Sequence, residues 1–186
     1  MKMADSQKIE APRETVWAAL NDPQVLKQCI PGCEELEMTD GNQMQAKVKL
    51  KVGPVKATFG GKVTLEDLNP PESYRIVGEG SGGVAGFAKG GAVVRLEEDG
   101  PDATILHYDV DAQVGGKIAQ LGGRLIDSTA KRLAGEFFKT FGEVVAPSSE
   151  NTEAAESTDG AEEPAKKGWL SGVFSKKDEK PADTDA

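Results

Sequence analysis

The feature that most constrains the fold is a two-residue alternation of apolar and polar residues. In the clearest run, QMQAKVKLKV, every second residue from Met44 to Val52 is apolar, and a lysine or glutamine stands between. Successive side chains of a β-strand point to opposite faces, so this period is typical of a strand with one face in a core and the other in water.

The alternation returns in several segments that turn residues separate. It resumes after Gly53-Pro54 as far as Leu65, and strands are also predicted at SYRIVGEG, VAGFAKGGAVVRLEE and ATILHYDVDAQV. The separators, which include Asn69-Pro70-Pro71 and the turn at Asp99–Asp102, are short. Strands joined in this way indicate an antiparallel meander.

The remaining segments predict one more strand and three helices. Residues 1–11 read as a strand, and prolines open two short helices at Pro12 and Pro23. Pro31-Gly32 is typical of a type II turn. The last segment, residues 117–145, has the three-to-four spacing of an amphipathic helix. The predicted class is α+β, a curved antiparallel sheet with a long C-terminal helix across it.

Composition changes after Val145. Residues 146–168 hold no Val, Ile, Leu or aromatic residue, so they cannot bury enough apolar surface to offset the entropy of ordering. We expect a folded domain at 1–146, a disordered acidic linker at 147–165, a short basic amphipathic motif at 166–177 and a disordered tail at 178–186.

Charge and hydropathy exclude several classes. The chain of 186 residues has a net charge of −9, which argues against a nucleic-acid partner. We expect no signal peptide and no membrane-spanning helix, since no apolar run has the required length. The sequence thus predicts a cytoplasmic protein, where a disulfide between Cys29 and Cys33 is not expected.

Four segments together resemble the CoxG family of carbon monoxide dehydrogenase subunits, a branch of the START-like (SRPBCC, helix-grip) superfamily. They are IEAPRETVWAALNDPQVLKQCIPGCEEL, VGPVKATFGGKVTLEDLNPP, GEGSGGVAGFAKGGAVV and VGGKIAQLGGRLIDSTAKRLAGEFF. The resemblance implies a sheet wrapped around the last helix, an internal apolar cavity and a hydrophobic ligand. It also implies an accessory, non-catalytic role beside an aerobic carbon monoxide dehydrogenase or related molybdenum hydroxylase. In that role the protein would sit on the inner face of the membrane and handle a quinone or lipid, with no covalent cofactor.

The motif CIPGC, residues 29–33, holds both cysteines. A metal site built on thiolates needs three or four ligands, and a thioredoxin-like redox pair has two intervening residues, whereas this motif has three. We interpret the motif as an apolar loop, which the resemblance places at the rim of the cavity. No metal ligand set is predicted.

The predicted cavity lining comes from the apolar strand faces, the long helix and the cysteine loop. Its residues are Cys29, Ile30, Val48, Leu50, Phe59, Val63, Phe87, Leu106, Tyr108, Leu121, Leu125 and Phe137. The glycines from Gly78 to Gly91 either leave volume for a ligand or mark a bend in the sheet. Gly122, Gly123 and Gly135 either permit close packing of the long helix or soften it. His107 is predicted to face water, and no residues assemble into a catalytic site.

The motif KKGWLSGVFSKK lies beyond the predicted linker. Trp169, Leu170, Val173 and Phe174 would share one face of a short helix with lysines at both ends, a pattern that suits an anionic membrane surface or a docking partner. Two other functions remain open at this point. The protein could be a tether or assembly factor without a ligand, or a polyketide-cyclase-like enzyme, which would need acid–base groups inside the cavity.

Overall fold

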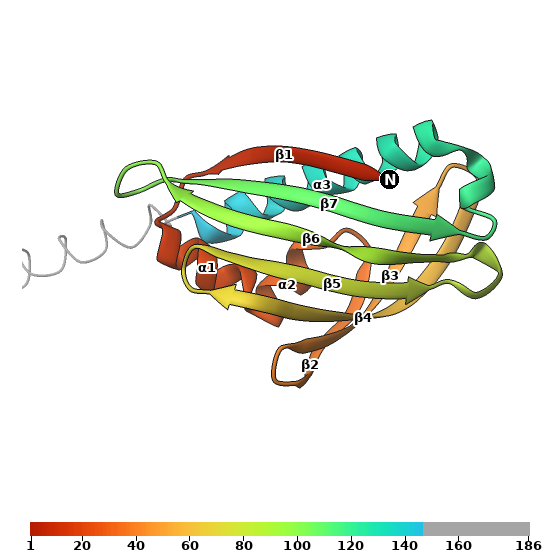
Figure 1. Cartoon of the computed structure of the whole chain (residues 1–186), viewed down its shortest axis with the longest axis horizontal. Helices are drawn as coiled ribbons and strands as arrows, with labels where there is room; N and C mark the ends of the chain where they lie inside the picture. The colour runs from red at the N-terminus through yellow and green to blue at the C-terminus, as the bar shows by residue number, and fades with distance from the viewer. Residues whose placement is uncertain (147–186) are drawn as a thin grey trace, which may run out of the picture. The chain divides into compact units, whose positions relative to one another are not determined.

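A computed structural model describes residues 1–146 of the chain. Seven antiparallel strands form one sheet in the order β1-β7-β6-β5-β4-β3-β2 (Figure 1). The strands are β1 Lys2–Ile9, β2 Cys33–Asp40, β3 Gln43–Val52, β4 Val55–Asn69, β5 Ser73–Ser81, β6 Phe87–Glu98 and β7 Thr104–Gly115. The helices are α1 Arg13–Leu20, α2 Pro23–Cys29 and α3 Gly123–Val145, with short 3-10 turns η1 Gly83–Ala85 and η2 Ala119–Leu121.

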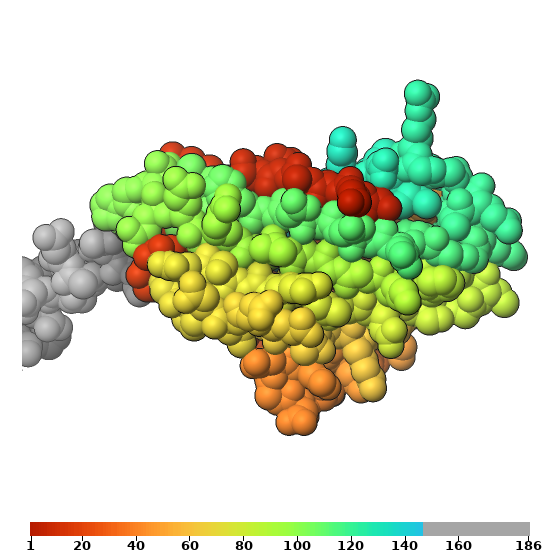
Figure 2. All heavy atoms as spheres, viewed as in Figure 1, coloured from red at the N-terminus to blue at the C-terminus, as the bar shows by residue number. Residues whose placement is uncertain are grey.

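The helix α3 runs along one face of the sheet, which we call the inner face. Figure 1 views the sheet from the opposite, outer face, with α3 behind the strands. In the space-filling view of this outer face, the strands cover most of α3, whose first turns project at one end (Figure 2). The predicted α+β class, a curved antiparallel sheet wrapped around a long C-terminal helix, is therefore confirmed.

The register of the strands pairs apolar residues of neighbouring strands with one another on the inner face. Tyr74 of β5 is paired with Val94 of β6, which is paired with Tyr108 of β7. A second row joins Leu65 of β4 to Ile76 of β5. Directly paired residues share a face, so the alternation seen in the sequence becomes one continuous apolar surface.

The helix α2 begins and ends as its sequence predicts. Asp22 is the N-cap, and its Oδ1 accepts a hydrogen bond from the Gln24 N–H at 2.8 Å. After the helix, the Cys33 N–H donates to the Ile30 carbonyl at 3.2 Å across Pro31-Gly32, and Gly32 has a φ of 75°. A positive φ at the third residue is the mark of a type II turn, so this expectation is confirmed.

Three elements differ from the sequence-based expectations. β2 is not predicted by alternation, because CEELEMTD is an edge strand with a single buried residue, Leu36. The last helix begins at Gly123 rather than Lys117, because Gly122 has a φ of 91° and separates it from η2. β6 begins at Phe87, after the 3-10 turn η1.

Candidate ligand-binding site

Burial along the inner face is graded from one end to the other. On β7, Leu106 is 2% exposed, whereas Tyr108, Val110, Ala112 and Val114 are all partly buried. The inner-facing residues of β3 to β6 change in the same way. They are buried at Met44, Leu65, Tyr74, Val94 and Leu96, and partly buried beyond them. The fully buried residues pack with Val16 and Leu20 of α1, so we call this the closed end of the inner face.

The facing side of α3 shows the same gradient. Phe141 and Val145 are buried at the closed end, and the apolar residues earlier in the helix, including Leu125 and Leu133, are only partly buried. Away from the closed end, the two facing apolar surfaces therefore both remain partly accessible.

Aromatic rings form the boundary between the buried core and the partly buried region. Tyr108 stacks on Phe138 with ring centroids 5.3 Å apart, and Phe137 contacts both Phe138 and Phe141 at 5.1 and 5.6 Å. Trp17 of α1 and Tyr74 of β5 pack in a T-shaped arrangement with ring centroids 5.4 Å apart. These contacts hold α1 and α3 against the sheet at the closed end.

Small residues occupy the middle of the inner face. Gly78 pairs with Gly90 and Gly61 pairs with Gly80, so the glycines of three strands meet. A Cβ on Gly61 would lie 2.5 Å from the Glu79 carbonyl oxygen, and one on Gly90 would overlap the Asp111 carbonyl. The sheet is thus bent so sharply that a side chain here would strike the next strand. Curvature explains these glycines, and it also leaves the inner face without side-chain volume at this point.

Three polar groups lie on the inner face at the β1 edge. Asp5 pairs with Tyr108 across β1 and β7, and Gln7 pairs with Leu106, so both polar residues share the face of Tyr108. Burial raises the pKa of Tyr108, the Asp5 carboxylate raises it further, and a side-chain hydrogen bond with Gln7 opposes the shift. Asp5 and Gln7 are not predicted from the sequence, because β1 lacks a regular alternation.

The cysteine loop is a packed turn. Cys29 is 2% exposed and belongs to the core, while Ile30 and Cys33 are partly buried against it. Both thiols are free, and the Cys33 Sγ lies 3.4 Å from the Glu35 carbonyl oxygen. Burial raises the pKa of both thiols, which keeps them protonated at neutral pH. The core position of Cys29 corrects the expectation that it lies at a rim.

The far end of the inner face is bordered by turns that touch α3 and η2. A Cβ on Gly53, in the β3–β4 turn, would lie 2.6 Å from Leu125 Cδ2 and 3.9 Å from Leu121 Cδ1. Phe59 of β4 packs on Gly82, whose Cβ would lie 2.8 Å from the ring. Leu121, Leu125 and Phe59 therefore border the end opposite to the closed one.

Eight of the twelve predicted lining residues lie on the inner face or on α3 opposite it, and Phe87 does not. By register, Val48, Leu50, Phe59, Val63, Leu106 and Tyr108 face inward, opposite Leu125 and Phe137 of α3. Phe87 lies on the outer face with its ring over Gly115, because it pairs with Ser81 and Gly115 at the start of β6. A ligand contact for any of these residues remains a prediction.

The helix glycines do not serve close packing. A Cβ on Gly122, Gly123 or Gly135 would meet nothing within 4 Å. The structure therefore excludes the interpretation that these glycines permit close packing of the long helix.

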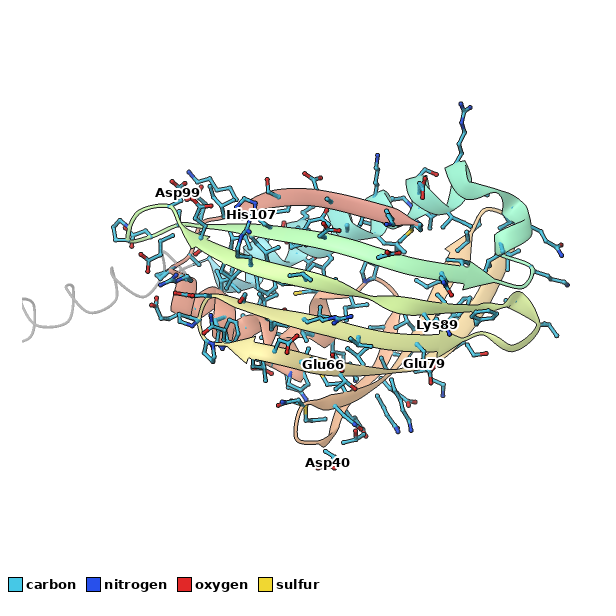
Figure 3. The ribbon with its side chains drawn as sticks, viewed as in Figure 1. Asp40, Glu66, Glu79, Lys89, Asp99 and His107 are labelled. Carbon is cyan, nitrogen blue, oxygen red and sulfur yellow. The ribbon has the colours of Figure 1, made fainter. Side chains whose placement is uncertain are left out.

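The outer face carries charged grooves. One, of about 1520 Å³, crosses the strands between Arg75, Lys89, His107 and Asp111, and another, of about 670 Å³, lies between Lys47 and Phe87. His107 faces this side as predicted, with Nε2 3.0 Å from Glu97 Oε2. Glu79 and Lys89 lie side by side on β5 and β6 (Figure 3). Open, mixed-charge surfaces of this kind do not match the apolar site that the sequence predicts.

Residues 1–146 contain neither a metal-binding cluster nor a membrane-spanning helix. Within this range no group of three or more His, Cys, Asp or Glu side chains is placed to hold a metal ion. None of its helices is long and apolar enough to cross a bilayer. The predicted docking residues Trp169, Leu170, Val173 and Phe174 lie outside the described residues.

The fold is that of the START-like proteins. A START superfamily protein from Mycobacterium smegmatis matches with a TM-score of 0.60 and 17% identity, over 77% of this chain and 96% of that one. The ZhuI aromatase/cyclase from Streptomyces sp. R1128 matches with a TM-score of 0.56 and 13% identity, over 78% and 93%. At these identities the likeness shows the fold alone.

The family follows from the sequence match. The model of the CoxG subunit of carbon monoxide dehydrogenase matches residues 6–146, and the chain belongs to this CoxG family. A conserved protein from Geobacillus kaustophilus is 32% identical with a TM-score of 0.75, over 78% of this chain and 95% of that chain. No curated protein matches the chain.

Proposed function

We propose that this protein is a non-catalytic carrier of a hydrophobic ligand, a quinone or a lipid, that serves an aerobic carbon monoxide dehydrogenase or a related molybdenum hydroxylase. The family membership supports the accessory role. In this proposal the protein works in the cytoplasm, at the inner face of the membrane, and links the enzyme to it. No covalent cofactor is involved.

One observation carries the ligand proposal. The inner sheet face and α3 present apolar residues to each other that are buried at the closed end and partly buried elsewhere. A filled core would bury both surfaces, because protein interiors are close-packed. An apolar molecule between Ala112 on the sheet and Leu125 on the helix would remove this surface from water, at about 25 cal/mol per Å².

The polar edge supports a ligand with an acceptor group. The raised pKa of Tyr108 keeps its phenol protonated at neutral pH, so its hydroxyl can donate a hydrogen bond. Gln7 lies on the same face and adds amide donors. A quinone combines an apolar body with carbonyl oxygens that accept such bonds, and so does an ester lipid.

A second candidate is acid–base catalysis on an aromatic ligand. Asp5 beside Tyr108 places two ionisable groups on the inner face, the minimum that such chemistry needs. The arrangement favours binding over catalysis, because the Asp5 side chain is exposed at the sheet edge and the raised pKa of Tyr108 makes its phenol a weaker acid and leaves little phenolate to act as a base. Turnover of an aromatic polyketide that is lost in Asp5→Asn would establish the catalytic alternative.

The carrier proposal is tested on the purified full chain. Native mass spectrometry, followed by solvent extraction, should detect one apolar molecule per chain, and the stripped protein should rebind a short-chain quinone. The absence of both co-purification and rebinding would contradict it. If such a protein still captured the dehydrogenase in a pull-down, it would be a tether without a ligand.

A further inference from the structure

Three connections of the fold meet at the end of the domain opposite the closed end. They are the β3–β4 turn, the β5–β6 loop and the β7–α3 connection (Figure 1). The Ile118 N–H donates to the Ala85 carbonyl at 3.0 Å, which ties the loop to the connection. The Gly53 turn packs on Leu121 and Leu125. We call this surface the basic end, for the charges given below.

The β5–β6 loop and the first residue of β6 expose apolar side chains. Val84 is 87% exposed and Phe87 is 46% exposed, while the neighbouring Ala85 is buried at 4%. The buried Ala85 and its hydrogen bond to Ile118 fix the loop, so Val84 projects from a packed turn. Two of the five large apolar side chains that are exposed among residues 1–146 thus lie at this loop.

The segments that meet at this end carry cations although the chain as a whole is acidic. The segments 50–60, 80–92 and 112–126 contain no Asp or Glu, against a net charge of −9 for the whole chain. They carry the exposed cations Lys51, Lys56, Lys117 and Arg124. Lys51 and Lys56 are directly paired across β3 and β4. Like charges in that position destabilise a sheet, so their presence together points to an anionic partner.

The carboxylates near this end are largely matched by lysines other than these four cations. Glu35, Glu37 and Glu79 line the groove beside Phe87 together with Lys47, Lys62 and Lys89. Asp111 lies 3.5 Å from the Lys2 Nζ. Asp127 lies one helical turn beyond Arg124 on α3, a spacing at which opposite charges attract, so it offsets part of that one charge. The cations of the turn and of the β7–α3 connection thus remain in excess at this end.

We propose that the basic end is a contact surface for an anionic lipid bilayer, with Val84 and Phe87 entering the interface and the four cations meeting the headgroups. Exposed apolar side chains with cations nearby suit such a bilayer, because the apolar side chains enter the acyl-chain boundary while the cations bind the anionic headgroups. The contact belongs to the folded domain and is separate from the predicted motif at residues 166–177. It rests on the membrane link in the proposed function but needs no ligand, so a loss of vesicle binding would leave the carrier proposal standing.

The test uses the full chain and vesicles of phosphatidylcholine with or without phosphatidylglycerol. Arg124→Glu should weaken binding to the anionic vesicles about fivefold or more, since each basic residue near such a surface contributes about 1 kcal/mol. Lys139→Glu is the matched control. It is exposed on the same helix, about 22 Å further along at 1.5 Å per residue, and should bind like the unmodified chain.

A second pair of variants tests the exposed apolar side chains. Val84→Ser with Phe87→Ser should weaken binding at least threefold. Val93→Ser with Met38→Ser removes two other exposed apolar side chains, 53% and 45% exposed, further along β6 and on β2, and should have no effect. All variants are repeated in a Trp169→Ser, Phe174→Ser background, and their thermal melting is compared to establish that they are folded.

Two results would overturn the proposal. In one, the folded Arg124→Glu and Val84→Ser, Phe87→Ser variants bind anionic vesicles as tightly as their controls. In the other, they keep vesicle binding but lose capture of the dehydrogenase, which would make the basic end a protein-docking surface.

Discussion

Gly32 and Lys49 join the cysteine motif to the sheet through a backbone contact. The Gly32 carbonyl accepts a hydrogen bond from the Lys49 N–H at 2.8 Å, and a Cβ on Gly32 would overlap the Lys49 carbonyl oxygen. The motif therefore attaches the end of α2 to β3. Its glycine meets two requirements at once, a φ of 75° and the absence of a side chain.

Replacing Gly32 with Ala should destabilise the domain by about 3 kcal/mol or more, because the left-handed conformation and a backbone clash act together. Gly41→Ala is the control. Gly41 also has a positive φ, of 50°, but its Cβ would meet nothing within 4 Å, so only about 1 kcal/mol should be lost. Urea unfolding measures both. Equal losses would show that the contact with Lys49 contributes nothing.

Ala112→Phe should abolish quinone rebinding with little change in stability. Ala112 is on the partly buried part of the inner face, and a ring there would occupy the space proposed for the ligand. Gln113→Phe adds the same ring on the outer face of the same strand. If the space is already filled, Ala112→Phe should instead lose about 1–3 kcal/mol through overpacking, and calorimetry separates the two cases.

Tyr108→Phe should weaken the binding of a quinone by about twofold to tenfold, the value of one net hydrogen bond. Binding of a hydrocarbon of similar size, which has no acceptor, should be unchanged. Tyr74→Phe removes a hydroxyl at the closed end and should leave both affinities unaffected. Fluorescence titration gives the dissociation constants, and an equal loss for the hydrocarbon would assign Tyr108 a purely apolar role.

Stability should fall as the pH rises above about 10, the ordinary pKa of tyrosine. Burial raises the pKa of Tyr74 in the folded state, so above pH 10 the folded chain keeps a proton that the unfolded chain has released. Unfolding therefore becomes more favourable with increasing pH. Tyr74→Phe should flatten this dependence between pH 9 and 11 in urea titrations, and an unchanged slope would exclude Tyr74 as its source.

The fold is predictable from sequence where one physical signal dominates. Alternation from Met44 to Val52 identifies an inward and an outward face, and the register of β3 with β4 agrees with it. β2 is not detected, because a charged edge strand needs only one buried residue, Leu36, and so has no apolar period. The predicted start of α3 is wrong because Ile118 and Leu121 have helical spacing, while the conformation of Gly122 interrupts the helix.

The candidate site is predictable only in part. The strand face that a residue occupies follows from the local sequence, but the residue that pairs with it on the next strand does not. Phe87 is predicted to line the site because it is apolar. Its position in β6, an odd number of residues from the inner-facing Val94, places its side chain on the outer face. Asp5 and Gln7 lie beside Tyr108 and Leu106 because β1, near the start of the chain, pairs with β7, about 100 residues later. No local pattern carries that long-range pairing.

The graded burial of the inner face has a consequence for motion. Each inner-facing strand has one part packed against α1 and α3 and another part that few side chains cover, so the free energy of local opening should differ along a single strand. Backbone amides near Leu106 should exchange with solvent only on global unfolding, and those near Ala112 much faster. The closed end would then stay folded while the opposite end of the inner face opens and closes locally.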